Sequence, residues 1–170
     1  MTPAARLRIT LLGLDPTPWR VIEVPLSMSF KELHYAIQAA FGWFDVHIWE
    51  FDFDGRIFGP PTDSNFGDER IHNAANAQLT KLHQAKATSF LYTYDLTDDW
   101  VHCIDIVELF DAGADAPLPR FLEGEWRAPP EDVRGPPGFE HFLEALLRKA
   151  APCTQCRFWC APAGSPTLRR

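Results

Sequence analysis

The sequence lacks the excess of basic residues that broad binding to nucleic acid requires. Its 16 lysine and arginine residues stand against 23 aspartate and glutamate residues, which gives a formal net charge of −7. Without a positive field, few counterions would be released when the chain met a phosphate backbone. The basic residues are scattered, and no helix-turn-helix pattern is visible. We therefore do not expect non-specific nucleic-acid binding.

The motifs of common nucleotide-binding and hydrolytic enzymes are also missing. The ten glycines form neither a G-x-G-x-x-G nor a Walker pattern. No G-x-S-x-G nucleophile elbow occurs either. The sequence therefore names no cofactor and no complete catalytic set. It favours a protein without catalytic activity, while leaving that question open.

Long hydrophobic runs are absent as well. The longest apolar stretch, residues 36–49, is interrupted by polar residues and glycine. It falls well short of the ~20 apolar residues that span a bilayer as a helix. Residues 1–6 lack the apolar segment of a secretory signal. We expect a cytoplasmic protein with no membrane partner.

Cysteine is scarce over most of the chain. Cys103 stands alone, and the other three, Cys153, Cys156 and Cys160, crowd into the last residues. A disulfide scaffold would spread its bridges through a small secreted domain, so this pattern indicates a reduced protein. The three clustered thiols lack the fourth ligand of a structural zinc site. We expect one domain over residues 1–150 and a tail, residues 151–170, with exposed or disordered thiols.

What the sequence does contain is a regular succession of strand and helix patterns. Alternating apolar residues over 7–12 and 19–24 predict a hairpin. The clearest helix follows over residues 30–41, where Ser29 and Glu32 form a capping box and Gly42 suits the helix end. Further strands are predicted over residues 48–53, 56–58, 90–95 and 100–108.

The remaining segments are less regular. Residues 71–84 predict a weaker helix, because apolar residues recur there among poor helix formers. Residues 112–138 hold too many prolines for a helix or a central strand and predict an ordered wrap over the surface. Residues 139–147 predict a final amphipathic helix. Together the elements predict an α+β fold: a largely antiparallel sheet of hairpins with amphipathic helices on one face, and an opening compatible with a β-grasp-like half.

The densest group of polar residues beside large aromatics lies in residues 92–102. A four-residue loop, 96–99, would place Asp95, Trp100 and His102 on one side of a strand pair. Asp95 could then orient the His102 imidazole for acid, base or metal-ligand chemistry. Alternatively, Asp95 only caps amides in the turn, and His102 only decorates a sheet face.

Two further histidines could join this group. His34 lies on the apolar face of the predicted 30–41 helix, as either a core histidine or a ligand. His47 follows the end of that helix. If the two loops converge, His34, His47 and His102 could form a mixed metal site with Asp95. No two histidines have the i, i+4 spacing of a helix-borne zinc site.

A third candidate group follows two adjacent prolines. Pro129 and Pro130 fix the backbone before Glu131 and Asp132, and so would aim both carboxylates reproducibly. These carboxylates suit either catalysis and binding or the capping of a helix-like turn. The candidate binding residues on an aromatic-rich surface are Trp43, His47, Trp100 and Trp126.

These motifs, in this order, resemble the plasmid pRiA4b ORF-3-like family over about residues 6 to 147. The matching stretches are residues 18–25, 33–43, 47–51, 92–102 and 128–139. The resemblance implies a compact α+β domain whose biochemical function is unsettled, often encoded on plasmids or mobile elements. Some members carry a resolvase-type label. Neither the serine-centred nor the tyrosine-centred residue set of a recombinase is visible in this chain.

The resulting expectation is a cytoplasmic module that binds an unidentified protein or small-molecule partner. Two alternatives remain open. One is a nucleic-acid accessory factor. The other is a metal-dependent or acid–base hydrolase-type enzyme that uses His34, His47, Asp95, His102, Glu131 and Asp132.

Overall fold

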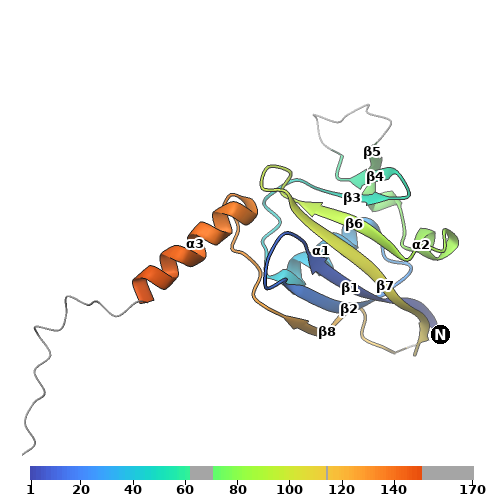
Figure 1. Ribbon diagram of the computed structural model, residues 1–170. Coiled ribbons are helices and arrows are strands. Elements are labelled where there is room, and N and C mark those ends of the chain that lie inside the picture. The colour runs from blue at the N-terminus through green and yellow to red at the C-terminus, as the bar shows by residue number, and fades with distance from the viewer. Residues whose placement is uncertain (62–70, 114, 151–170) are drawn as a thin grey trace, which may run out of the picture.

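The computed structural model describes residues 1–61, 71–113 and 115–150, which form one eight-stranded sheet with helices (Figure 1). Across the sheet the strands run in the order β5 (Ile71–Asn73), β4 (Arg56–Gly59), β3 (Trp49–Phe53), β6 (Ser89–Tyr94), β7 (Trp100–Ala112), β1 (Thr2–Leu11), β2 (Trp19–Pro25) and β8 (Arg120–Glu125). Every neighbouring pair is antiparallel except β4–β5, which is parallel. The predicted α+β class is confirmed.

Alternation along the strands separates a buried face from an open one. On β1, Leu7, Ile9 and Leu11 are fully buried, while Arg8 and Thr10 between them remain partly exposed. Side chains in a strand point alternately to the two faces of its sheet, so one face of β1 carries the core. The hairpin of β1 and β2 is the one expected from residues 7–24.

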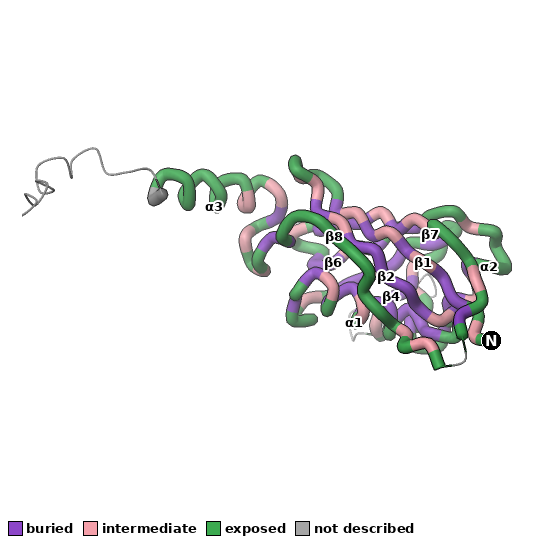
Figure 2. Tube along the Cα trace, turned by 90° about the horizontal axis from the view of Figure 1, so that it is seen from below, coloured by how far each residue is buried: buried purple, intermediate pink, exposed green. Residues whose placement is uncertain are grey.

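Helix α1 (Phe30–Phe41) covers that buried face (Figures 1 and 2). The capping box is present: Ser29 Oγ accepts from the amide of Glu32, and the Glu32 carboxylate accepts from the amide of Ser29. Gly42 ends the helix in the left-handed conformation, at φ 78°. Phe30 packs among the rings of Phe51, Phe58 and Phe90, which places the centre of the core between α1 and the sheet.

The open face is crossed by a chain of charges that ties three strands together. Glu23 on β2 is almost completely buried and binds Arg6 of β1 and Arg120 of β8, with shortest N–O distances of 2.7 and 2.6 Å. Burial alone would raise the pKa of Glu23, but the hydrogen bonds from the two arginines lower it further than burial raises it. The ionised carboxylate thereby holds the edge strand β8 on the sheet.

The continuous helix predicted over residues 71–84 is wrong. Ile71–Asn73 is strand β5, Ala74–Asn76 is a 3-10 turn (η1), and only Thr80–Gln84 (α2) is α-helical. The Asn73 side chain accepts from the amide of Ala75 and so caps the turn. Pairing of β5 with β4 therefore overrides the apolar spacing, while Leu79 and Leu82 still reach the core.

The proline-rich segment and the last helix also differ from expectation. Residues 120–125 form β8, an edge strand, where proline neighbours are tolerated. Helix α3 (Gly135–Ala150) starts before residue 139, with Pro136 and Pro137 in its first turn, where the missing amide costs no hydrogen bond.

The sequence predicted that the amphipathic helices pack on one face of the sheet. Helix α3 does not. It extends away from the sheet and is exposed along most of its length (Figures 1 and 2). Both neighbours of β1, the strands β2 and β7, run antiparallel to it, so the opening lacks the parallel strand beside β1 that a β-grasp-like half requires.

Two sequence expectations concern membranes and the tail. Within the described ranges, no helix is both long and apolar enough to cross a membrane. The predicted tail, with Cys153, Cys156 and Cys160, lies outside the described residues.

Candidate functional site

Three segments meet at one end of the sheet: residues 42–48 after α1, the β6–β7 loop 95–99, and residues 126–134 before α3. We call them the three-loop end. The amide of Asp95 donates to the carbonyl of Ile48, and the amide of Arg134 donates to the Asp98 carboxylate. The amide of Phe44 donates to the Glu131 carboxylate. The convergence that the sequence could only suppose is therefore present.

Tyr94 and Glu131 link the sheet to two of these segments. The Tyr94 hydroxyl donates to Glu131 Oε1 over 2.6 Å and accepts from the amide of Val46 over 3.1 Å. Burial, together with the hydrogen bond to Glu131, raises the pKa of Tyr94, so the hydroxyl keeps its proton. Glu131, a predicted catalytic carboxylate, is thus engaged in holding residues 44–46 in place.

His34 is one of four residues that form a closed ring of hydrogen bonds. Its Nε2 lies 2.8 Å from Asp45 Oδ1, and its Nδ1 lies 2.8 Å from the Tyr92 hydroxyl. Gln38 completes the ring, since its Nε2 donates to Tyr92 and its Oε1 accepts from the amide of Asp45. The Trp49 ring stacks on the imidazole at 4.1 Å.

This ring fixes the protonation of His34. Burial lowers the pKa of His34 to about 4, although Asp45 opposes that shift. The neutral imidazole donates from Nε2 to the Asp45 carboxylate and accepts at Nδ1 from Tyr92. Both nitrogens are occupied, so His34 orders the loop instead of offering a free base or ligand.

His102 lies deeper, and its predicted pairing with Asp95 is wrong. Tyr94 pairs with Trp100 and Tyr92 with His102, so the loop has five residues and Asp95 belongs to it. His102 is fully buried, with the edges of the Phe41 and Trp43 rings against it. Its Nδ1 lies 3.3 Å from the carbonyl of Tyr92, and burial lowers its pKa to about 4.

His47 is the most accessible of the three candidate histidines, with 27% of its side chain exposed. Its Nε2 lies 3.1 Å from Asp132 Oδ1 and 3.5 Å from Asp95 Oδ2. The other oxygen of Asp95 accepts from the amides of Thr97 and Asp98. Asp95 therefore caps its turn, as the alternative interpretation held, and also faces a histidine other than the one predicted.

The three histidines surround two tyrosine rings instead of a common point. The Tyr92 ring lies 6.0 Å from His34 and 5.2 Å from His102, and the Tyr94 ring lies 5.8 Å from His47. In the described part of the chain, no three histidine, cysteine or carboxylate side chains are placed to hold a metal ion. The predicted metal ligands His34, His47 and His102 do not share a site.

The predicted binding tryptophans occupy different environments. Trp43 and Trp100 are buried, and Trp43 Nε1 donates to the carbonyl of Pro129 over 2.8 Å while its ring stacks on Tyr94. Both are parts of the core beneath the three-loop end. Trp126 is 54% exposed and lines a separate groove at the start of α3.

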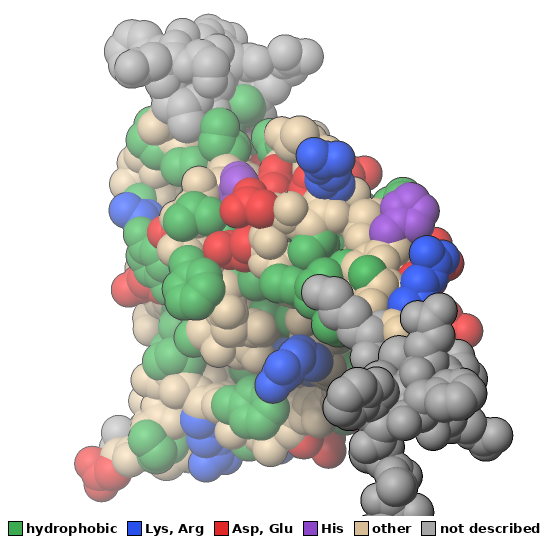
Figure 3. Space-filling model, turned by 90° about the vertical axis from the view of Figure 1, so that its left-hand side faces the viewer, with side chains coloured by type: hydrophobic (Ala, Val, Ile, Leu, Met, Phe, Trp, Pro, Cys, Tyr) green, Lys and Arg blue, Asp and Glu red, His purple; other side chains and the backbone are tan. Residues whose placement is uncertain are grey.

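Apolar side chains stand out around the buried network. Phe44 is 80% exposed, and Val46, Ile48 and Leu96 are also exposed. Figure 3, which looks at this end of the molecule, shows carboxylates and a histidine gathered beside hydrophobic side chains. The surface of the three-loop end is therefore mixed, acidic and apolar, above a polar network in which His34 and Tyr94 are fully bonded, while Nε2 of His102 has no hydrogen-bond partner among the described residues.

Sequence reasoning missed Tyr92, Tyr94, Gln38 and Asp45 as parts of the network. The Tyr-x-Tyr spacing in β6 places both hydroxyls on one face of the sheet, and that signal was available. Gln38 is one turn from His34 on α1, so their proximity could also be inferred. Their common partner, Tyr92, is far away in sequence.

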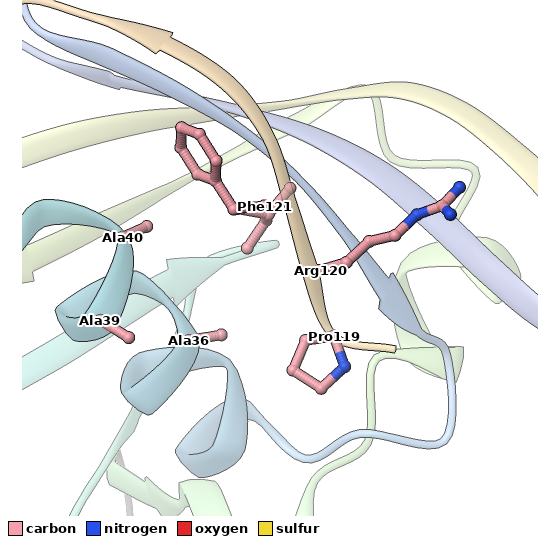
Figure 4. A pocket seen from close by; sticks show the side chains of 7 residues that line it. Ala36, Ala39, Ala40, Pro119, Arg120 and Phe121 are labelled. Atoms are coloured by element: carbon pink, nitrogen blue, oxygen red, sulfur yellow. The ribbon is translucent and has the colours of Figure 1, made fainter. Parts of the chain in front are cut away.

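A separate hollow of about 390 Å³ lies between α1 and β8 (Figure 4). Ala36, Ala39 and Ala40 form its α1 side, and Pro119 and Phe121 form the other side. Figure 4 shows the Arg120 side chain running away from the alanines, in keeping with its ion pair to Glu23. The hollow includes none of the candidate site residues.

The fold and site together define an α+β protein with one mostly antiparallel sheet, whose end is a loop surface fastened by tyrosine, histidine and carboxylate contacts. The chain belongs to the plasmid pRiA4b ORF-3-like protein family, whose model matches residues 3–162. That match extends beyond the 6–147 span of the recognised motifs at both ends and confirms the resemblance.

Two relatives agree with this assignment. The chain is 39% identical over 146 residues to the uncharacterized protein y4hQ of Sinorhizobium fredii. The matched region covers 85% of this chain and 74% of y4hQ. A crystal structure of a protein of unknown function, MM3350 from Methanosarcina mazei Go1, superposes with a TM-score of 0.78 and 26% identity. That likeness covers 100% of this chain and 96% of the other.

Proposed function

We propose that this chain is a protein-binding module of the cytoplasm whose functional domain is residues 1–150 and whose recognition surface is the three-loop end. One observation carries the proposal: the buried side chains of His34 and Tyr94 are already bound to Asp45 and Glu131, while Phe44, Val46, Ile48 and Leu96 are left exposed. Clustered exposed apolar side chains rimmed by polar ones mark interaction surfaces.

Charge selects the kind of partner. The three-loop end carries six carboxylates against two arginines, Arg127 and Arg134; the carboxylates are Asp45, Asp95, Asp98, Asp99, Glu131 and Asp132. Asp132 is 76% exposed at the rim. Such a surface attracts cationic groups and speeds encounter with them. The partner is therefore a protein segment that presents lysine or arginine beside apolar side chains.

The loops of this end are held in place before any partner binds, which favours tight binding more than a mobile surface would. Tyr94, Glu131 and the His34 ring fix residues 43–47 before a partner arrives. Ordering a loop on binding consumes part of the interaction free energy, and a loop already held avoids that loss. The buried network therefore supports recognition without touching the partner.

The test uses a peptide array in which lysine or arginine alternates with apolar residues, beside a matched array with glutamate at the charged positions. The wild-type chain should bind the basic array, and Phe44→Ser should weaken that binding by at least tenfold, as expected for an interface anchor. Tyr35→Ser is the matched control, because Tyr35 is an exposed aromatic on α1 outside this end. Equal binding of both arrays, or unchanged binding by Phe44→Ser, would refute the proposal.

A second function rests on His47. An imidazole that is partly exposed and has two carboxylates, Asp132 and Asp95, within 3.1 and 3.5 Å of one ring nitrogen is an arrangement used for general acid–base catalysis. If this is the function, His47→Gln abolishes turnover of a hydrolysable substrate and leaves the peptide array unaffected. If the chain is a binding module, the same variant alters peptide binding slightly and no turnover is found in either form.

A further inference from the structure

Besides the three-loop end, one face of α3 also exposes apolar side chains. Its apolar residues recur at i, i+3, i+4, i+7 and i+8; they are Phe139, Phe142, Leu143, Leu146 and Leu147. A helix with this spacing normally lays its apolar stripe against a core. Here Leu147 is 72% exposed, and the helix stands clear of the sheet (Figures 1 and 2). Phe139, at the start of the stripe, packs partly against the core, but the chain's own sheet does not cover the other four residues.

A groove lies where α3 leaves the body. Its volume is about 310 Å³, and its walls include Leu14, Pro16, Pro18 and Trp126. Phe139 and Leu143 line the groove and also belong to the α3 stripe. Groove and stripe are therefore one continuous apolar surface, concave at the start of the helix and convex towards its end.

We propose that α3 joins two copies of this chain in an antiparallel two-fold dimer, in which Leu146 and Leu147 of each copy fill the groove of the other. Sixteen helical residues span about 24 Å, so α3 is long enough to lie across a second α3. An antiparallel pair centred near Leu143 sets Leu147 opposite Phe139 of the other copy. A two-fold contact of this kind uses the same patch twice and closes without further growth.

The area that a stable interface needs agrees with a second copy on the α3 stripe and the groove. A stable interface buries about 800 Å² from each partner. A fully buried large aromatic side chain contributes about 150–250 Å², so the partly exposed side chains of the stripe alone supply only part of that area. The groove, with Trp126 half-exposed, adds further apolar area, and a second copy carries both a stripe and a groove, so that each stripe can meet a groove.

Charges at the two ends agree with this arrangement. Asp15 and Glu140 lie at the groove, together with Arg127. Arg148 lies near the far end of α3, where its exposed side chain pairs with Glu144 of the same helix over 3.2 Å. In the antiparallel pair Arg148 of one copy approaches the two carboxylates of the other, which favours this orientation over a parallel one.

The test is the molar mass of the full chain in solution, measured by light scattering after size-exclusion chromatography over a wide range of concentrations. The wild-type protein should have twice the mass of one chain. Leu147→Glu should raise the dissociation constant at least tenfold and give single chains, and Trp126→Glu should weaken the dimer through the groove. Circular dichroism should be unchanged, because Leu147 lies outside the core.

His141→Glu is the matched control. It places the same charge on α3 at an exposed position opposite the apolar stripe, so the dimer should persist. A wild-type mass of one chain at every concentration would overturn the proposal. So would a dimer that survives Leu147→Glu, or one that His141→Glu dissociates equally.

Discussion

The Tyr94 hydroxyl on β6 donates a hydrogen bond to Glu131 Oε1 over 2.6 Å, and this contact joins the sheet to the segment that leads into α3. The residues are 37 positions apart in the chain. Glu131 accepts a second bond from the amide of Phe44, so one carboxylate oxygen links all three parts. Phe44, the most exposed aromatic of the three-loop end, is therefore positioned by a contact beneath it.

Tyr94→Phe should weaken this end of the molecule. The substitution removes the bond to Glu131 and leaves the partly buried amide of Val46 without its acceptor. Loss of such partners costs about 1–3 kcal/mol of unfolding free energy. Denaturant unfolding measures the change, with Tyr35→Phe on the exposed side of α1 as the control. A Tyr94→Phe protein as stable as the control would contradict this role.

Acid should destabilise the protein through its buried histidines. Burial lowers the pKa of His102 from 6.5 to about 4, so the unfolded chain takes up a proton at higher pH than the folded chain. Unfolding free energy therefore falls as the pH drops from about 6.5 towards 4, by up to about 1.4 kcal/mol per pH unit for each such group. His34 acts in the same direction.

Denaturant unfolding between about pH 7 and 5 isolates this effect, because most carboxylates titrate at lower pH. His102→Leu should show a shallower loss of stability over that interval than the wild-type protein. His83→Leu, at an exposed histidine, should keep the wild-type slope. Identical slopes in all three proteins would show that His102 does not titrate as described.

Arg20 should be far more costly to replace than an exposed arginine. Its Nε donates to the carbonyl of Ala40, and its Nη1 donates to the carbonyls of Trp19 and Glu125. The side chain is nearly buried and joins the end of α1 to β8. Arg20→Met removes three hydrogen bonds to these carbonyls and should lower the unfolding free energy by about 2–4 kcal/mol. Arg56→Met, at an exposed position, should change it little.

The α1 cap should contribute a smaller, local amount. Ser29→Ala removes the acceptor for the amide of Glu32 and should cost about 1 kcal/mol of unfolding free energy. Ser27→Ala, two residues earlier and exposed, is the control. The difference between the two midpoints in denaturant measures the cap, and equal midpoints would show that Ser29 does not stabilise the helix.

The helix α1 was predictable because its signals lie within a few residues of one another. Ser29, Glu32 and Gly42 mark its ends, and the apolar spacing between them sets its buried face. The β6–β7 hairpin was predictable as an element but not in register. Asp95 and Asp99 adopt left-handed backbone conformations, with φ 55° and 56°, which lengthens the loop by one residue. A one-residue slip exchanges the two faces of a strand, and this placed Asp95 wrongly beside His102.

The site depends on contacts that no local pattern contains. Gln38 binds Tyr92 from 54 positions away, and Trp43 binds the carbonyl of Pro129 from 86 positions away. The sequence indicated which segments carry polar residues, including His47 and Asp132. It raised a meeting of His47 with Asp95 only on the condition that the loops converge, and it did not place Asp132 beside His47, because that choice follows from how three loops pack.

The position of β1 in the sheet sets an order for folding. Thr2–Leu11 pairs with β2 on one edge, but its other edge pairs with β7, about a hundred residues later in the chain. A growing chain can form the first hairpin early and must then keep one edge of β1 open until residues 100–112 have been made. Pairings so distant in sequence form slowly, and an open strand edge can pair with other chains. The pairing of β1 on both of its edges is therefore among the last steps in forming the sheet.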